Sequence, residues 1–204
     1  MKIPEQSAVT YDRFVLHMDR QHVPGLFPLL QQGVVIRVRP GQTIDALLRN
    51  HLGLPADYIA RHVSTVFLNA KPVDDIHTAV IGHDDTLALS GAMPGLVGAI
   101  MRRGSFYSSF RTPITVEDQD GIEKNTDLQT TDLRIKLFNK ILREIGPQLL
   151  HSGIIITPRQ FLDILPPVLP QCTAVIRNES QLSTDGLTAI PREMKRTPDE
   201  ENNR

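Results

Sequence analysis

The sequence predicts an α+β fold in which a small sheet carries one crossing helix and a smaller, mostly helical unit follows. The stretch from Gly33 to Met101 supports the sheet, because its short apolar, β-branched runs are separated by one helix-spaced segment. Apolar residues recur at three- and four-residue spacing after residue 130, which supports the helical unit. Packing a helix on a sheet is a common way to bury the apolar faces of both.

The composition of the chain limits its possible partners. Of its 204 residues, 40% are hydrophobic and 22% are charged, which is ordinary for a protein with a buried core. The net charge of −1 provides no global field for nucleic acid or an anionic membrane, so no extended nucleic-acid surface is expected. Cys172 is the only cysteine, which excludes an internal disulfide and a thiolate metal cage. The longest apolar run, 89–101, is shorter than the roughly 20 residues of a membrane helix and contains Pro94. We therefore expect a cytoplasmic protein.

The N-terminal part predicts a strand and then a loop. Residues 11–19 alternate apolar and polar side chains, as a half-buried first strand would. Pro24-Gly25 and Pro28 then predict a proline-restricted connection. The apolar side chains of that connection either pack on the sheet, which is the expected alternative, or form a partner-binding patch. They are Leu26, Phe27, Leu29 and Leu30.

A strand, a capped helix and three further strand segments are predicted in the next part. Residues 34–38 form the strand, and Thr43 is placed to cap a helix over 43–52. Residues 65–68 and 86–89 are two more strands, with a short edge segment at Pro72 between them. The predicted core residues of this region are Ile44, Leu47, Leu48, Val66, Leu68, Leu87 and Leu89.

Three short motifs in this region resemble a known family. They are Phe-Leu-Asn-Ala-Lys-Pro-Val at 67–73, Gly-His-Asp-Asp-Thr-Leu-Ala-Leu at 82–89 and Pro-Gly-Leu-Val-Gly at 94–98. Together they are similar to the ubiquitin-like β-grasp of the sulfur-carrier type, the family of the molybdopterin-synthase small subunit and the thiamine-biosynthesis sulfur carrier. The resemblance covers residues 33–98, with the strand at 11–19 completing the sheet, and implies a β-grasp-like domain over 1–101.

The resemblance also implies what a carrier would require. Sulfur carriers of this family act through a C-terminal Gly-Gly whose carboxylate is adenylated and thiolated. Here Gly95 and Gly98 lie where that tail would begin, but Gly98 is followed by Ala99 and the chain continues to residue 204. Carrier chemistry would therefore require cleavage after Gly98.

A basic and aromatic segment follows the sheet region. Its candidate anion-binding residues are Arg102, Arg103, Arg111, Phe106 and Tyr107. Guanidinium groups match phosphate oxygens and aromatic rings can stack on a base, so a nucleotide or a phosphorylated cofactor would fit this segment. In the alternative interpretation the segment packs half-buried on the sheet domain, and its arginines pair with acidic residues at 117–123.

The C-terminal half predicts helices and a polar tail. The longest helix begins at Thr131, places Leu133, Leu137 and Ile141 on one face, and stops or kinks at Gly146-Pro147. A buried strand or apolar connector at 153–157, a helix from Thr157 to about Leu165 and a last strand at 173–176 follow. The predicted units are a β-grasp-like domain (1–101), a basic segment and linker (102–130), a helical unit (131–177) and a disordered tail (178–204).

No motif with recognisable catalytic chemistry is found in the sequence. HExxH, G-x-S-x-G and Walker A patterns are absent, and the acids and histidines at 74–85 are most simply turn formers. We therefore expect no enzyme activity, no catalytic residue, no metal and no cofactor. The expected function is a ubiquitin-like binding or scaffold module that acts through a protein partner or self-association. The alternatives are a sulfur-carrier precursor and a binder of a small anionic ligand at 102–111.

Overall fold

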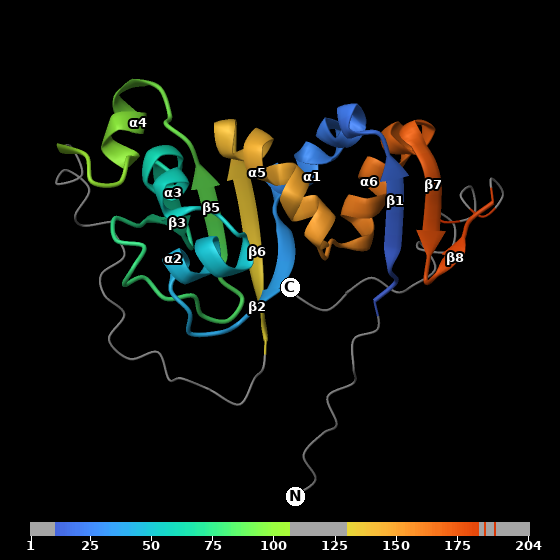
Figure 1. Cartoon of the computed structure of the whole chain (residues 1–204), viewed down its shortest axis with the longest axis horizontal. Coiled ribbons are helices and arrows are strands. Elements are labelled where there is room, and N and C mark those ends of the chain that lie inside the picture. Colours follow the sequence, from blue (N-terminus) through green and yellow to red (C-terminus); the bar gives the residue numbers. More distant parts are fainter. Residues whose placement is uncertain (1–10, 107–129, 184–185, 187–189, 191–204) are drawn as a thin grey trace, which may run out of the picture. The chain divides into compact units, whose positions relative to one another are not determined.

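The computed structural model describes residues 11–106, 130–183, 186 and 190 (Figure 1). The chain forms two compact units. The larger comprises Pro24–Gln160, and the smaller combines Met1–Val23 with Phe161–Arg204. The structure is mixed α/β, as the sequence predicts.

The larger unit is built on a five-stranded sheet in the order β2-β6-β5-β3-β4. These strands are β2 (Val34–Val38), β3 (Thr65–Leu68), β4 (Lys71–Pro72), β5 (Thr86–Ser90) and β6 (Thr131–Phe138). Neighbouring strands are antiparallel except for β5 and β6, which run parallel. The strand that comes last in this part of the chain therefore lies inside the sheet, between β2 and β5.

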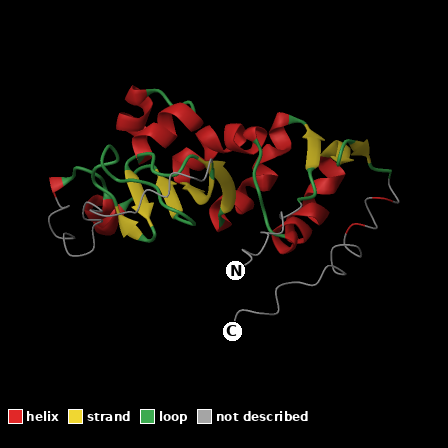
Figure 2. Ribbon diagram, turned by 90° about the horizontal axis from the view of Figure 1, so that it is seen from below, coloured by secondary structure: helices red, strands yellow, loops and turns green. Residues whose placement is uncertain are grey.

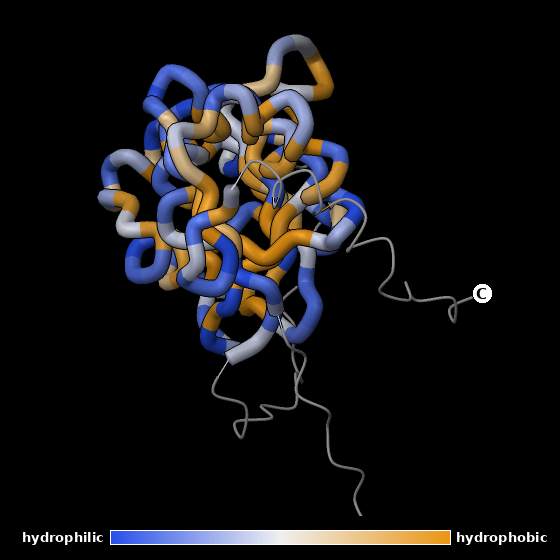
Figure 3. The backbone as a smooth tube through the Cα atoms, turned by 90° about the vertical axis from the view of Figure 1, so that its right-hand side faces the viewer, coloured by the Kyte–Doolittle hydropathy of each residue, from blue (hydrophilic) through white to orange (hydrophobic). Residues whose placement is uncertain are grey.

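One face of this sheet carries the core. Val34 lies opposite Ile135, Ile135 opposite Leu87, and Leu87 opposite Leu68. Paired residues of neighbouring strands point to the same face, so these side chains form one apolar row across four strands. All are at most 1% exposed. Figure 3 shows the hydrophobic stretches of the chain in orange and the hydrophilic ones in blue.

The predicted helix at 43–52 is confirmed. Thr43 Oγ1 accepts a hydrogen bond from the backbone N–H of Ala46 at 3.2 Å and so caps the first turn of α2 (Ile44–Ala46). The helix continues as a π-helical turn, η2 (Leu47–His51), and Gly53 with a φ of 64° follows it. The predicted core residues of this region are all at most 1% exposed.

Two further helices lie beside η2. They are α3 (Ala56–His62) and α5 (Asn139–Ser152). The Gln148 side-chain amide donates to the Leu52 carbonyl at 2.9 Å, and the Tyr58 hydroxyl donates to Glu144 Oε2 at 2.5 Å. Since α5 also contacts β5 and β6, the helices of this unit form a layer along the sheet (Figure 2).

The connection at 24–33 differs from the predicted loop. It ends in a short helix, α1 (Phe27–Gln32), after the 3-10 segment η1 (Arg20–Leu26). Leu29 and Leu30 are 4% and 0% exposed, so the expected packing of these side chains is confirmed. A Cβ at Gly146 would approach Leu30 Cδ1 to 3.0 Å, which shows how closely α1 and α5 pack.

The helix predicted to begin at Thr131 is wrong over its first two turns. Residues 131–138 form β6, and α5 begins only at Asn139. Leu133 and Leu137 are four residues apart, a spacing that shares a face in both a helix and a strand. Ile135, which is 0% exposed between them, settles the period as two. The helix α5 then continues through Pro147 to Ser152 instead of stopping there.

The smaller unit has a three-stranded antiparallel sheet in the order β1-β7-β8. Its strands are β1 (Phe14–Met18), β7 (Cys172–Arg177) and β8 (Ser180–Gln181). The strand predicted at 11–19 therefore exists, but it pairs with β7 and does not complete the larger sheet. Contacts within the unit favour this pairing, because the Phe14 ring lies 4.4 Å from that of Phe161 and Arg177 pairs with Asp12 at 2.7 Å.

The C-terminal elements agree in part with the sequence. The backbone N–H of Gln160 donates to Thr157 Oγ1 at 3.2 Å, which confirms the predicted cap of α6 (Pro158–Val168). This helix passes through Pro166 and Pro167, and the 3-10 segment η4 (Leu169–Gln171) follows it. The predicted helical unit at 131–177 thus contains β6 and β7, and most of the tail predicted after residue 177 lies outside the described residues. In the described part of the chain, no helix is long and apolar enough to span a membrane.

Candidate functional site

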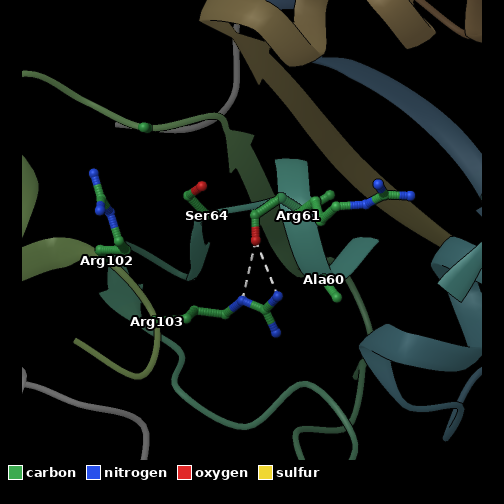
Figure 4. Close-up of a pocket in the computed structure, with 7 residues that line it drawn as sticks. Ala60, Arg61, Ser64, Arg102 and Arg103 are labelled. Carbon is green, nitrogen blue, oxygen red and sulfur yellow. Dashed lines mark hydrogen bonds between the residues drawn. The ribbon is translucent and has the colours of Figure 1, made fainter. Parts of the chain in front are cut away.

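The larger unit has a pocket of about 320 Å³ where α3 leads into β3 (Figure 4). Its walls come from three places in the chain: the end of α3, the exit from β5, and the segment that follows α4 (Gly95–Met101). The lining residues are Ala60, Arg61, Val63, Ser64, Ala92, Arg102 and Arg103.

Backbone hydrogen bonds hold these three segments together. The N–H of Ser64 donates to the carbonyl of Ser90 at 3.1 Å, which joins the start of β3 to the end of β5. The N–H of Arg103 donates to the carbonyl of Ser64 at 2.9 Å. The residues after α4 are therefore fixed against the first residues of β3, and the position of the pocket follows from the sheet.

Arg103 is the half-buried cation of this pocket. Its Nε and Nη2 atoms donate to the carbonyl oxygen of Val63 at 3.2 and 3.0 Å (Figure 4). No carboxylate of the described residues lies within ion-pair distance of its guanidinium group. Burial lowers the pKa of Arg103 below the usual value of an arginine, and the charges of Asp74, Asp75 and Asp45 act in the opposite direction. The positive charge is thus partly desolvated, and among the described residues its only close partner is a backbone carbonyl.

The side chains of the other two arginines of the pocket do not point towards the guanidinium group of Arg103. Arg61 is exposed and pairs with Asp57 one helical turn earlier, and its side chain points away from Arg103 in Figure 4. Arg102 is also exposed, and its side chain lies apart from the guanidinium group of Arg103. The hydroxyl of Ser64 lines the pocket and has no hydrogen-bond partner among the described residues.

The predicted anion-binding residues are only partly described. Arg102 and Arg103 both line the pocket, as a site at this segment requires. Phe106 is 87% exposed. Tyr107 and Arg111 lie outside the described residues, as do the acidic residues at 117–123.

Nothing in the sequence indicates the other half of the pocket. Arg61 and Ser64 are about forty residues from Arg103 in the chain, and they lie in the stretch between one predicted helix and the next strand. Neither belongs to a recognisable motif. Only the pairing of β3 with β5 brings them beside the segment after α4.

The two predicted carrier-tail residues lie in α4. Gly95 opens the helix with a φ of 77°, and Gly98 is buried within it. A Cβ at Gly98 would overlap the backbone carbonyl of Met93, so this position requires glycine for close packing. The segment predicted as the start of a tail is thus a packed helical turn. Its outer side chains, Leu96 and Val97, are 67% and 66% exposed.

Two of the acids at 74–85, Asp75 and Asp85, accept hydrogen bonds from backbone N–H groups of this turn region. Asp85 accepts hydrogen bonds from the Gly82 N–H and from the Asn69 side-chain amide, both at 2.6 Å. Asp75 accepts one from the His77 N–H at 2.8 Å. No group of histidine, cysteine, aspartate and glutamate within the described residues is placed to hold a metal ion.

Comparisons of the chain with known protein families, with curated proteins and with solved structures find no match.

Proposed function

We propose that the larger unit is a ubiquitin-like, β-grasp-type module that binds a protein partner and has no catalytic chemistry of its own. The strand order of its sheet is the observation that carries the proposal. In a β-grasp the first and last strands run parallel at the centre of the sheet, and a helix lies between the second and third strands. The parallel pair β6 and β5 takes those central places, and the helix α2–η2 follows β2.

The proposed relationship includes a change of chain order. The strand equivalent to the first one of a β-grasp is β6, which comes after all the others in the chain. The unit would thus be a circularly permuted β-grasp that begins at its second strand. Termini of domains often lie close together, so a permuted order can preserve the packing of a fold.

Exposed apolar side chains indicate where a partner would dock. Leu96, Val97 and Phe106 are each at least 66% exposed and lie within eleven residues of one another, on α4 and just after it. Grouped apolar residues at a surface are typical of protein-binding sites. Arg102 is exposed within the same segment. A partner that matches this surface presents apolar side chains flanked by carboxylates.

Site-specific cross-linking tests this docking surface. A photoreactive amino acid at Leu96, introduced in the cells that naturally make the protein, should attach to a defined partner, and one at the exposed Arg49 on η2 should not. With the partner purified, Leu96→Asp should weaken binding by about tenfold or more, and Arg49→Asp should leave it nearly unchanged. Equal cross-linking from both positions would contradict the proposal, and so would an affinity for the partner that Leu96→Asp leaves unchanged.

Self-association is the alternative occupant of this surface. Sedimentation velocity of the purified chain decides between a different protein partner and a second copy of this chain. A dimer that Leu96→Asp dissociates would show that a second copy docks on α4, and the partner proposal would then be wrong.

A sulfur-carrier function remains a separate proposal. It requires cleavage after Gly98, a bond inside α4. The intact mass of the protein from its natural host tests it directly. A species that ends at Gly98 and carries added sulfur would support the carrier, and full-length chain alone would argue against it.

A further inference from the structure

We infer that the pocket around Arg103 binds the phosphate group of a small molecule. This inference does not depend on the docking surface of α4. It rests on the half-buried guanidinium group, on the polar groups beside it, and on the size of the pocket.

The charge of Arg103 is the first argument. A cation that is partly removed from water is costly unless an anion or several hydrogen bonds compensate for it. Here the guanidinium group uses two N–H groups on the Val63 carbonyl, and no described carboxylate pairs with it. Arginine has five N–H donors, and three of those of Arg103 have no acceptor among the described residues, so a ligand could use them. An anion in the pocket would neutralise the charge and use these donors.

The fixed orientation of Arg103 is the second argument. The bonds from Nε and Nη2 to Val63 hold one edge of the guanidinium plane, and the backbone bond to Ser64 holds the residue itself. A guanidinium group held in this way is already oriented, so little side-chain entropy is lost when a phosphate binds. Fixed guanidinium forks are the usual partners of phosphate oxygens.

The rest of the lining favours phosphate over carboxylate. Four side chains with hydrogen-bond donors line the pocket in addition to small apolar ones: Arg61, Ser64, Arg102 and Arg103. A phosphate monoester offers three terminal oxygens with a charge between −1.5 and −2, whereas a carboxylate offers two oxygens and one charge. Ala60 and Ala92 leave room for the part of the ligand that bears the phosphate. The volume of about 320 Å³ is at the small end of the range of ligand pockets, which is roughly 300–1,000 Å³.

Calorimetric titration of the full-length chain tests this inference. The probes are inorganic phosphate, ribose 5-phosphate and AMP, with acetate and succinate as carboxylate controls, in a buffer of low ionic strength. At least one phosphate compound should bind with a Kd of about 1 mM or below, and the carboxylates should bind at least about tenfold more weakly.

Three variants locate the phosphate-binding site: a matched pair of arginine substitutions and one serine substitution. Arg103→Gln should weaken phosphate binding by about tenfold or more, and its amide can still donate to the Val63 carbonyl. Arg49→Gln removes the same charge from an exposed residue that pairs with Asp45, and it should change the affinity less than about twofold. Ser64→Ala removes only a hydroxyl and should weaken binding by about threefold to tenfold.

The outcomes that overturn the inference are equally defined. It is wrong if none of the phosphate compounds binds at about 10 mM, if acetate or succinate binds as tightly, or if Arg49→Gln weakens binding as much as Arg103→Gln. If Arg103→Gln also lowers the melting temperature, the titration of Ser64→Ala decides instead, and unchanged phosphate binding by Ser64→Ala then overturns the inference. Leu96→Asp should leave phosphate binding unchanged, so failure here and failure of the docking proposal are separable.

Discussion

Single residues of the larger unit differ widely in what they contribute to stability. Leu47 lies on η2 and is 0% exposed, whereas Leu96 lies on α4 and is 67% exposed. Replacing Leu47 with alanine should lower the free energy of unfolding by about 2–5 kcal/mol, because it leaves a cavity between the helix and the sheet. Leu96→Ala should change it by less than about 0.5 kcal/mol. Urea unfolding followed by circular dichroism measures both, and equal losses would show that Leu47 is not a core residue.

The hydrogen bond between Tyr58 and Glu144 makes stability depend on pH at both ends of the scale. The Tyr58 hydroxyl lowers the pKa of Glu144 below its usual value of 4.5, and Lys140 adds to the effect. A depressed carboxyl pKa stabilises the fold fully above the unfolded pKa, and this contribution is lost as the pH falls through the folded pKa. Burial first and Glu144 second raise the pKa of Tyr58 above 10.0. The contribution of Tyr58 to stability is fully present below the unfolded pKa of tyrosine. It is lost as the pH rises through the folded pKa of Tyr58.

Replacing Tyr58 tests this linkage. Tyr58→Phe should raise the pKa of Glu144 towards its usual value and flatten the acid limb of the stability curve. Lys140→Met should also raise the Glu144 pKa, because the hydrogen bond and the charge of Lys140 both lower it. Carboxyl chemical shifts of Glu144 from an NMR titration report the change. A Glu144 pKa that Tyr58→Phe leaves unaltered would show that the hydrogen bond does not form in solution.

At the scale of elements, β6 holds the sheet together. It pairs with β2 on one side and with β5 on the other, and its buried residues alternate with half-buried ones along all eight positions. Ile135 faces the core and Lys136 faces the other side of the sheet. Neighbouring residues of one strand thus have different environments, as the two-residue period requires.

The same substitution at these two neighbours tests the strand. Ile135→Gln should destabilise the protein by about 3–5 kcal/mol, because it buries an amide without partners and removes apolar contacts. Lys136→Gln should cost less than about 1 kcal/mol. A helix over 131–138 would place Ile135 opposite the line of Leu133 and Leu137, and both substitutions would then be mild. Thermal and urea unfolding of the two variants separates these alternatives.

At the scale of the whole molecule, the larger unit depends on residues that are distant in the chain. Leu133, Ile135 and Leu137 of β6 are each 0% exposed. Burying three such side chains contributes about 5–9 kcal/mol, which is comparable to the total stability of a typical domain, about 5–15 kcal/mol. Among the described residues, β2 has no other partner strand, and its only further pairing is an isolated bridge between Val35 and Ile155.

A truncated chain of residues 1–101 should therefore not fold. Without β6, β2 loses its partner strand and β5 becomes an exposed edge. The amide NMR spectrum of the fragment should show narrow dispersion, and its thermal melt should lack a cooperative transition. Addition of a peptide that spans 131–152 should restore part of the dispersion. A well-dispersed spectrum from the fragment alone would mean that the sheet does not require β6.

The local elements of this protein follow from the sequence alone. Hydrophobic period, turn residues and caps are set by neighbours in the chain, so the strand at 34–38, the Thr43-capped helix and the strands at 65–68 and 86–89 follow from them. The buried positions of these elements follow as well, because a strand or helix of known period has a defined apolar face.

The pairing of these elements, in contrast, depends on contacts between distant parts of the chain. The strand at 14–18 joins β7 and leaves its place in the larger sheet to β6, whose even spacing of leucines suits a helix equally well. The pocket depends on the same pairing, since Arg103 meets Ser64 only where β3 lies beside β5. Strand partners are chosen by complementary edges and apolar faces far apart in the chain, and no local pattern encodes that choice.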